Sequence, residues 1–215
     1  MSAHDVVLFD LDGVLVDSRV AFARSINHAL ASQGLTPRPE RELYRLLGPP
    51  LHEALAELLP ERSLLQPCVE AYRARYRELG ASETAVFDGI RELLEGLSGR
   101  LPLLVVTSKP QALAEPLLAT LGLRIFFEGV VGPSLESENE PKGVTLARAL
   151  EELAPSARPL MVGDRRHDVI AAHEHRLRAI GVLWGVGSET ELLSAGADEL
   201  IDSPGELAMR LVPQA

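Results

Sequence analysis

The stretch Asp5-Val6-Val7-Leu8-Phe9-Asp10-Leu11-Asp12-Gly13 decides the fold. Its four consecutive apolar residues predict a strand that is buried on both faces, and Gly13 predicts a turn at its end. Strands of this kind belong to parallel sheets that helices cover on both sides. Asp10 and Asp12 stand two residues apart, so in extended backbone their side chains face the same side.

The chain after residue 85 alternates between short apolar runs and segments of helical periodicity. We expect strands at 101–107, 159–163, 178–184 and 198–202, with a further short apolar segment at 125–131. We expect helices at about 90–97, 110–121, 142–153 and 167–176. Strands that alternate with helices predict an α/β fold with a doubly wound parallel sheet.

Residues 19–83 have a different character, because apolar residues recur there at helical spacing and proline and glycine separate the segments. This pattern predicts a small all-helical unit inserted after the first strand. We therefore expect two domains. Residues 1–16 and 85–215 would form the α/β core, and residues 17–84 would form a helical cap.

The composition excludes several classes of protein. The chain has 215 residues, 46% of them hydrophobic, a formal net charge of −10 and a single cysteine, Cys68. The negative charge argues against a nucleic acid polymer as partner, since such binders need a basic face. Apolar runs are too short for a membrane span of about 20 residues, and the beginning of the chain does not resemble a signal peptide. We expect a cytoplasmic protein with no membrane partner, and we leave the oligomeric state open.

Acidic and hydroxyl residues gather at the ends of the predicted strands. Asp10 and Asp12 end the first strand, Thr107 ends the second, and Asp164 and Asp168 follow the strand at 159–163. Ligands of open parallel sheets bind at the carboxyl ends of the strands. Four carboxylates in one crevice would repel each other, and a divalent cation would remove that repulsion. Carboxylate oxygens suit Mg²⁺, so we expect a magnesium site there.

Four segments together resemble the motifs of the haloacid dehalogenase superfamily of phosphohydrolases. The first motif is similar to residues 10–18 (Asp-Leu-Asp-Gly-Val-Leu-Val-Asp-Ser), and the second to Thr107-Ser108-Lys109-Pro110. Lys142 resembles the third motif, and Gly163-Asp164-Arg165-Arg166-His167-Asp168 resembles the fourth. The place and size of the helical insertion resemble the cap of the phosphoglycolate phosphatase-like group.

The resemblance implies a role for each carboxylate. Asp10 would attack phosphorus and form an aspartyl phosphate, which divides one difficult displacement into two easier ones. Asp12 would protonate the leaving alcohol and then activate water. The metal ligands would be the carboxylates of Asp10 and Asp164 and the backbone carbonyl of Asp12, and the carboxylate of Asp168 would bind the metal directly or through water.

The resemblance also implies which residues bind the substrate. Thr107 would hydrogen-bond a phosphoryl oxygen with Ser108 beside it, and Lys142 would neutralise phosphoryl charge. Lys109 is either a cation that holds an anionic substrate or a solvated surface lysine. The turn around Gly48 would place a loop of the cap at the active site.

The implied activity is a Mg²⁺-dependent phosphatase for a small phosphate monoester. A phosphomutase of the β-phosphoglucomutase type and a nucleotidase are the alternatives. One departure from the family pattern concerns the helix that follows the fourth motif. The family often ends this helix with a left-handed glycine, and here Arg176 occupies that position.

Overall fold

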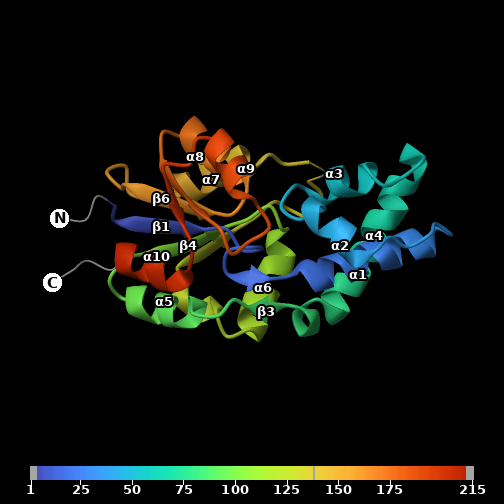
Figure 1. The fold of residues 1–215 in the computed structure, drawn as a ribbon, viewed down its shortest axis with the longest axis horizontal. Helices are drawn as coiled ribbons and strands as arrows, with labels where there is room; N and C mark the ends of the chain where they lie inside the picture. Colours follow the sequence, from blue (N-terminus) through green and yellow to red (C-terminus); the bar gives the residue numbers. More distant parts are fainter. Residues whose placement is uncertain (1–3, 138, 212–215) are drawn as a thin grey trace.

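A computed structural model describes residues 4–137 and 139–211 of the chain (Figure 1). It contains a sheet of six parallel strands in the spatial order β5-β4-β1-β6-β7-β8. Their bounds are β1 Val6–Phe9, β4 Leu103–Val106, β5 Gly129–Val131, β6 Pro159–Gly163, β7 Arg178–Val182 and β8 Glu199–Ile201. The predicted α/β fold with a doubly wound parallel sheet is confirmed.

Helices cover both faces of this sheet. One layer holds α5 (Ile90–Leu97), α6 (Gln111–Thr120) and α10 (Pro204–Leu211), and the other holds α7 (Lys142–Glu151), α8 (Arg166–Glu174) and α9 (Glu189–Ser194). Figure 1 shows the two layers on opposite sides of the strands. The predicted helices at 90–97, 110–121, 142–153 and 167–176 correspond to α5, α6, α7 and α8. The sequence reasoning did not predict α9 or α10.

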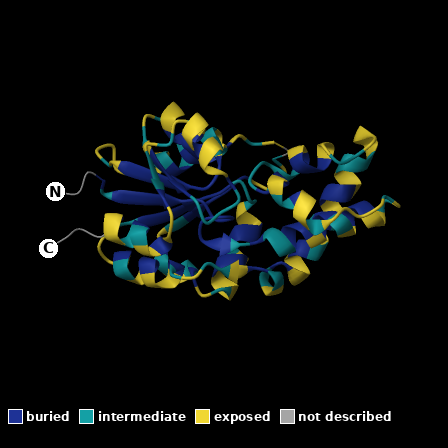
Figure 2. Cartoon of the chain, in the orientation of Figure 1, coloured by how far each residue is buried: buried dark blue, intermediate teal, exposed yellow. Residues whose placement is uncertain are grey.

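Alternate residues of each strand face opposite layers, as the period of a strand requires. Val7 and Phe9 of β1 pack with the α5, α6 and α10 layer, and Val6 and Leu8 pack with the α7, α8 and α9 layer. All four side chains are buried, and Figure 2 shows the central strands buried beneath helices whose outer faces are exposed. A strand enclosed in this way needs apolar residues at every position, which explains the unbroken run at residues 6–9.

The segment after β1 is helical, as predicted. Its longest helices are α1 (Arg19–Ser32) and α4 (Leu65–Leu79), which pack against each other. The shorter elements are α2 (Glu40–Leu43), α3 (Leu51–Ala56) and the 3₁₀ helices η1 (Tyr44–Leu46), η2 (Arg62–Leu64) and η3 (Ala81–Glu83). We call residues 19–83 the helical insertion. It has a hydrophobic cluster of its own, built almost entirely from its own side chains.

Two short strands connect the helical insertion to the rest of the chain. β2 (Val16–Asp17) and β3 (Ala85–Val86) pair in antiparallel fashion, so the chain leaves and returns at the same place. In Figure 1 the helices of the insertion extend beyond the carboxyl ends of the sheet strands. That residues 17–84 form a separate domain remains a prediction.

The strand order reverses between β1 and β6. From β1 the chain moves outward through β4 to β5, and it then returns to the other side of β1 and continues through β6, β7 and β8. In such sheets the loops on either side of this point diverge and leave a crevice at the carboxyl ends of the strands. The residues that follow β1 and β6 are therefore adjacent. Within the described ranges, no helix has both the length and the apolar character needed to cross a bilayer.

The end of α8 shows how the chain accommodates Arg176. Its φ of 61° makes it the sole residue other than glycine with a left-handed backbone in the described part of the chain. The amide of Leu177 donates to the Ala172 carbonyl at 2.9 Å, and that of Arg176 donates to the His173 carbonyl at 3.0 Å. This is the hydrogen-bond pattern with which a glycine normally ends a helix. The left-handed conformation is retained, although arginine occupies the position.

Replacing Arg176 with glycine should stabilise the protein. A left-handed backbone costs a residue with a Cβ atom about 1–2 kcal/mol, and the Arg176 side chain is exposed. Glycine loses more conformational entropy on folding, so we expect the free energy of unfolding to rise by about 1 kcal/mol. Urea denaturation measures the change. Arg176→Ala is the control, because it removes the charge and keeps the Cβ atom. If Arg176→Ala were as stable as Arg176→Gly, the loss of the arginine charge, and not the backbone conformation, would explain the gain in stability.

Candidate active site

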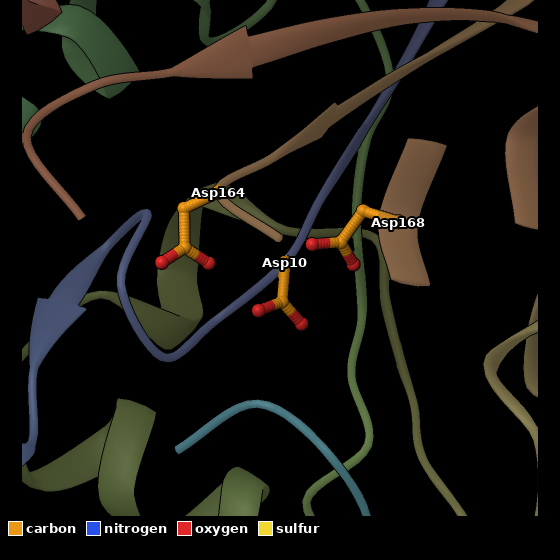
Figure 3. A group of neighbouring side chains, drawn as sticks. All are labelled: Asp10, Asp164 and Asp168. Atoms are coloured by element: carbon orange, nitrogen blue, oxygen red, sulfur yellow. The ribbon is translucent and has the colours of Figure 1, made fainter. Parts of the chain in front are cut away.

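Three aspartates meet where the strand order reverses. Asp10 follows β1, Asp164 follows β6, and Asp168 lies in the first turn of α8. The Asp10 amide donates to the Val162 carbonyl at 2.9 Å, which ties the end of β1 to β6. All three aspartates are buried. One carboxylate oxygen from each lies within 4.8 Å of the other two, and Figure 3 shows the three side chains converging.

Lys142 is the cation of this carboxylate cluster (Asp10, Asp164 and Asp168). It is the first residue of α7, and its ammonium donates to Asp10 Oδ1 at 2.5 Å and contacts Asp168 Oδ1 at 2.8 Å. Its side chain is only 5% exposed. Burial alone would lower the pKa of Lys142, but the attraction of the two carboxylates outweighs burial and raises it. Lys142 therefore stays charged.

One ammonium does not balance three carboxylates. Burial raises the pKa of Asp10 to about 7, against the opposing attraction of Lys142, and the Asp168 charge raises it further. Burial likewise raises the pKa of Asp164 well above its ordinary value, and the charges of Asp168 and Asp10 add to the effect. The cluster is therefore short of positive charge.

The cluster fits a divalent cation. Asp164 Oδ2 accepts a hydrogen bond from the Val186 amide at 2.7 Å, but Asp164 Oδ1 is buried and has no hydrogen-bond partner among the described residues. A buried carboxylate oxygen without a partner is costly, and a cation would satisfy it. The donors are all oxygens, which suits Mg²⁺. The structure thus brings together three of the four predicted metal ligands through their side chains.

The carboxylate of Asp12 points elsewhere. It accepts hydrogen bonds from the hydroxyl of Ser18 at 2.5 Å and from the ammonium of Lys109 at 2.7 and 2.5 Å. Ser18 precedes α1, where a serine hydroxyl usually caps the helix, but here it makes no cap hydrogen bond. The side chains of Asp10 and Asp12 thus point to different partners. Asp10 faces the carboxylate cluster, and Asp12 faces Lys109.

Lys109 is not a solvated surface lysine. Its side chain is 8% exposed, and besides Asp12 it donates to the hydroxyl of Tyr76 at 2.9 Å. Tyr76 belongs to α4 of the helical insertion, so a core lysine connects Asp12 with the insertion. Burial opposes the charge of Lys109, but Asp12 outweighs this effect and raises the pKa of the ammonium. Whether Lys109 also binds substrate stays a prediction.

A cavity of about 60 Å³ lies between the core and the helical insertion. The core contributes predicted site residues to its wall, namely Asp10, Asp12, Thr107, Ser108 and Lys109. The insertion contributes Gly48, also as predicted, together with Leu47, Pro49 and the aromatic residues Phe22, Tyr72 and Tyr76. The structure therefore brings Gly48 to the same cavity as Asp10.

Sequence reasoning missed the place of several residues that line this cavity or contact the residues that line it. The helical spacing of Tyr72 and Tyr76 indicates burial, but it does not reveal that both rings also line a cavity. Ser18 stands within the first motif, yet nothing in the pattern identifies Asp12 as its partner. Arg165 lies inside the fourth motif, and its partners come from distant segments.

Comparison with known proteins agrees with this geometry. Residues 7–182 match the family described as haloacid dehalogenase-like hydrolase. A 5′-nucleotidase from Pseudomonas aeruginosa is 36% identical over 189 residues, which cover 86% of this chain and 86% of that protein. A phosphoglycolate phosphatase from Chromobacterium violaceum is 34% identical over 212 residues, which cover 94% and 93% of the two chains.

A solved structure gives the same result. A protein described as a predicted phosphatase from Clostridium acetobutylicum has a TM-score of 0.91 and 32% identity, and the match covers 98% of this chain and 99% of that one. The family match extends from β1 to the end of β7 and so includes all three residues of the carboxylate cluster. The chain belongs to the haloacid dehalogenase-like hydrolases, and it is a phosphoric monoester hydrolase of that family.

Proposed function

We propose that this protein hydrolyses a small phosphate monoester in the presence of Mg²⁺, through an aspartyl phosphate on Asp10, as a phosphoglycolate phosphatase-like enzyme. One observation carries the proposal. Asp10 is buried within 4.8 Å of Asp164 and Asp168, it is paired with Lys142, and it also lines the cavity that a substrate would enter. A carboxylate in this position combines a metal ligand and a nucleophile in one residue.

The carboxylate cluster would hold the metal ion, with the backbone carbonyl of Asp12 as a further ligand. When bound, Mg²⁺ would neutralise charge on the phosphoryl oxygens and keep Asp10 ionised. The unpartnered Oδ1 of Asp164 supports this assignment.

The remaining residues would position and neutralise the phosphoryl group. Lys142 carries a positive charge next to Asp10, on the side where negative charge gathers during attack. Thr107 and Ser108 line the cavity at the end of β4, where the Thr107 hydroxyl would donate to a phosphoryl oxygen. Phosphoryl transfer depends chiefly on such positioning and charge neutralisation.

Asp12 would act as the general acid and base. Its carboxylate lies in the cavity wall, and Ser18 and Lys109 fix its orientation away from the carboxylate cluster. Protonated at the start of the cycle, it would give that proton to the leaving alcohol, and it would regain a proton from the attacking water in the second step. Keeping its carboxylate apart from the metal ligands leaves it available for proton transfer.

The size of the cavity favours a small leaving group. The cavity is small, at about 60 Å³. The leaving group of phosphoglycolate, the substrate named for the Chromobacterium relative, has two carbons and suits such a cavity. A nucleoside, as named for the Pseudomonas relative, is much larger and would need more space between the helical insertion and the core. A mutase would need a hydroxyl group of a second substrate beside Asp12, at the position where a phosphatase admits water.

Replacing Asp10 and Asp12 separately tests the proposal. Asp10→Asn keeps the shape of the side chain and removes the nucleophile, so we expect turnover to fall by about 10⁴-fold or more. Asp12→Asn should reduce turnover by about 10²–10⁴-fold, the usual contribution of general acid–base catalysis. The measurement is kcat/KM across a panel of phosphate esters with Mg²⁺. Near-normal turnover by Asp10→Asn would refute the proposed role of this residue.

Mg²⁺ should stabilise the protein more at high pH than at low pH. Without metal, the folded-state pKa of Asp10 of about 7 exceeds the ordinary carboxyl value of 3.8. Stability from this group is therefore present below the ordinary value and is lost as the pH rises through 7. Mg²⁺ binds the ionised carboxylates and so restores stability at high pH.

We expect the rise in melting temperature on adding MgCl₂ to be larger at about pH 8 than at about pH 5.5. Thermal denaturation followed by circular dichroism measures it, with NaCl at matched ionic strength as the control. Asp10→Asn should reduce the difference between the two pH values. If MgCl₂ raised the melting temperature equally at both pH values, the carboxylates with raised pKa values would not be the groups that bind the metal.

A further inference from the structure

Arg165 is a buried cation for which the proposed chemistry has no use. It follows Asp164 at the end of β6, and the residue is 9% exposed. Its Nε atom donates to Glu191 Oε1 at 2.9 Å, and the same oxygen accepts the Arg166 amide at 3.0 Å. Burial opposes the charge of Glu191, but these two hydrogen bonds lower its pKa below the ordinary value. Glu191 thus provides Arg165 with a charged anchor on the core.

The other end of the Arg165 side chain reaches the helical insertion. Its Nη1 atom donates to the backbone carbonyl of Leu47 and lies 3.4 Å from the carbonyl of Arg45. We call residues 45–49 the insertion loop. Leu47 and Pro49 of this loop line the cavity. Arg165 belongs to the core, and it thus holds the segment of the insertion that faces the cavity. The contact is made with the main chain of that segment.

The insertion loop is shaped to receive this guanidinium. Gly48 has a φ of 114°, a conformation that favours glycine, and a Cβ atom placed on it would lie 3.0 Å from Arg165 Cγ. Since the acceptors are backbone carbonyls, the contact needs glycine at position 48 but does not use the side chains of the neighbouring loop residues. The loop can therefore present different side chains to a substrate while its position stays fixed.

The same residue also contacts the carboxylate cluster. The backbone amide of Arg165 donates to Asp168 Oδ2 at 3.1 Å, while its side chain holds the insertion loop. The loop is therefore held in a defined position relative to the carboxylate cluster. An error in that position would displace the leaving group from Asp12.

We propose that Arg165, anchored by Glu191, is a positioning residue that holds the insertion loop against the active site and so fixes where the leaving group lies. The kinetic consequence of this inference rests on the proposed function. Its structural consequence, the position of the insertion loop, does not depend on the proposed function. Among the described residues, the Arg165 side chain donates its hydrogen bonds to Glu191 and to the insertion loop, and its charge acts on Asp164 only through space. Its loss should therefore weaken substrate binding more than it slows the chemical step.

Hydrogen–deuterium exchange tests the structural part without turnover. Arg165→Met keeps the length of the side chain and removes its donors, so we expect the amides of residues 45–48 to exchange about 10-fold faster. Arg166→Met is the matched control, because it removes the same charge from the adjacent, exposed arginine. Unchanged exchange of the loop in Arg165→Met, at normal exchange elsewhere, would overturn the proposal.

A second variant separates positioning from stability. Arg165→Met leaves Glu191 without its partner and can destabilise the fold, whereas Arg165→Met with Glu191→Gln removes both charges. We expect the double variant to recover the melting temperature but not the slow exchange of the loop. Recovery of slow exchange along with the melting temperature would show that Arg165 acts only through stability, and would also overturn the proposal.

Kinetics provide the third measurement, on the best ester of the wild-type panel. Both Arg165 variants should raise KM by about 10-fold and change kcat by less than about 3-fold, with Arg166→Met unchanged. An equal fall in kcat at constant KM would contradict the positioning role. If the wild-type protein hydrolyses no ester, the proposed function fails, and the exchange experiment still decides whether Arg165 holds the loop.

Discussion

The repulsion among three buried carboxylates is the constraint on which the rest of this structure depends. Asp10, Asp164 and Asp168 bring oxygens within 4.8 Å of one another, and Lys142 supplies one positive charge. Isolated buried charges are costly, so such a cluster persists only where the fold enforces it and a cation offsets it. The raised pKa values of Asp10 and Asp164 express the missing positive charge. A divalent cation would balance the remaining charge of the cluster, and it would attract a phosphate dianion that the carboxylates alone would repel.

The fold places two of the three carboxylates at the ends of neighbouring strands. Strands β1 and β6 lie side by side in the middle of the sheet, so the strands that carry Asp10 and Asp164 at their ends are held by backbone hydrogen bonds on both flanks. The helical insertion supplies the other wall of the cavity, through Tyr76, Gly48 and their neighbours. Two core cations reach across to it, Lys109 through a hydroxyl and Arg165 through backbone carbonyls. The core and the insertion are thus connected at two places beside the carboxylate cluster.

The sequence predicts the local parts of this arrangement well and the long-range parts poorly. The apolar run at residues 6–9 predicts a buried strand because strand burial is a property of consecutive residues. The aspartates after β1 and β6 are recognisable because they follow such runs. In contrast, the ion pair of Lys109 with Asp12 joins residues 97 positions apart, and no periodicity encodes it. The contact of Arg165 with Leu47 spans 118 positions. Helices α9 and α10 were missed because short helices at the end of the sheet carry few periodic positions.

The central claim is that the phosphoryl group is transferred first to Asp10 and then to water. The stereochemistry at phosphorus tests it most directly, with a phosphorothioate ester that is chiral at phosphorus through two oxygen isotopes and is hydrolysed in water that carries the third isotope. Each in-line displacement inverts the configuration, so two successive displacements through a thiophosphorylated Asp10 predict inorganic thiophosphate with overall retention. Direct attack of water, with Asp10 serving only as a metal ligand, predicts inversion. Retention would support the role assigned to Asp10, and inversion would contradict the account.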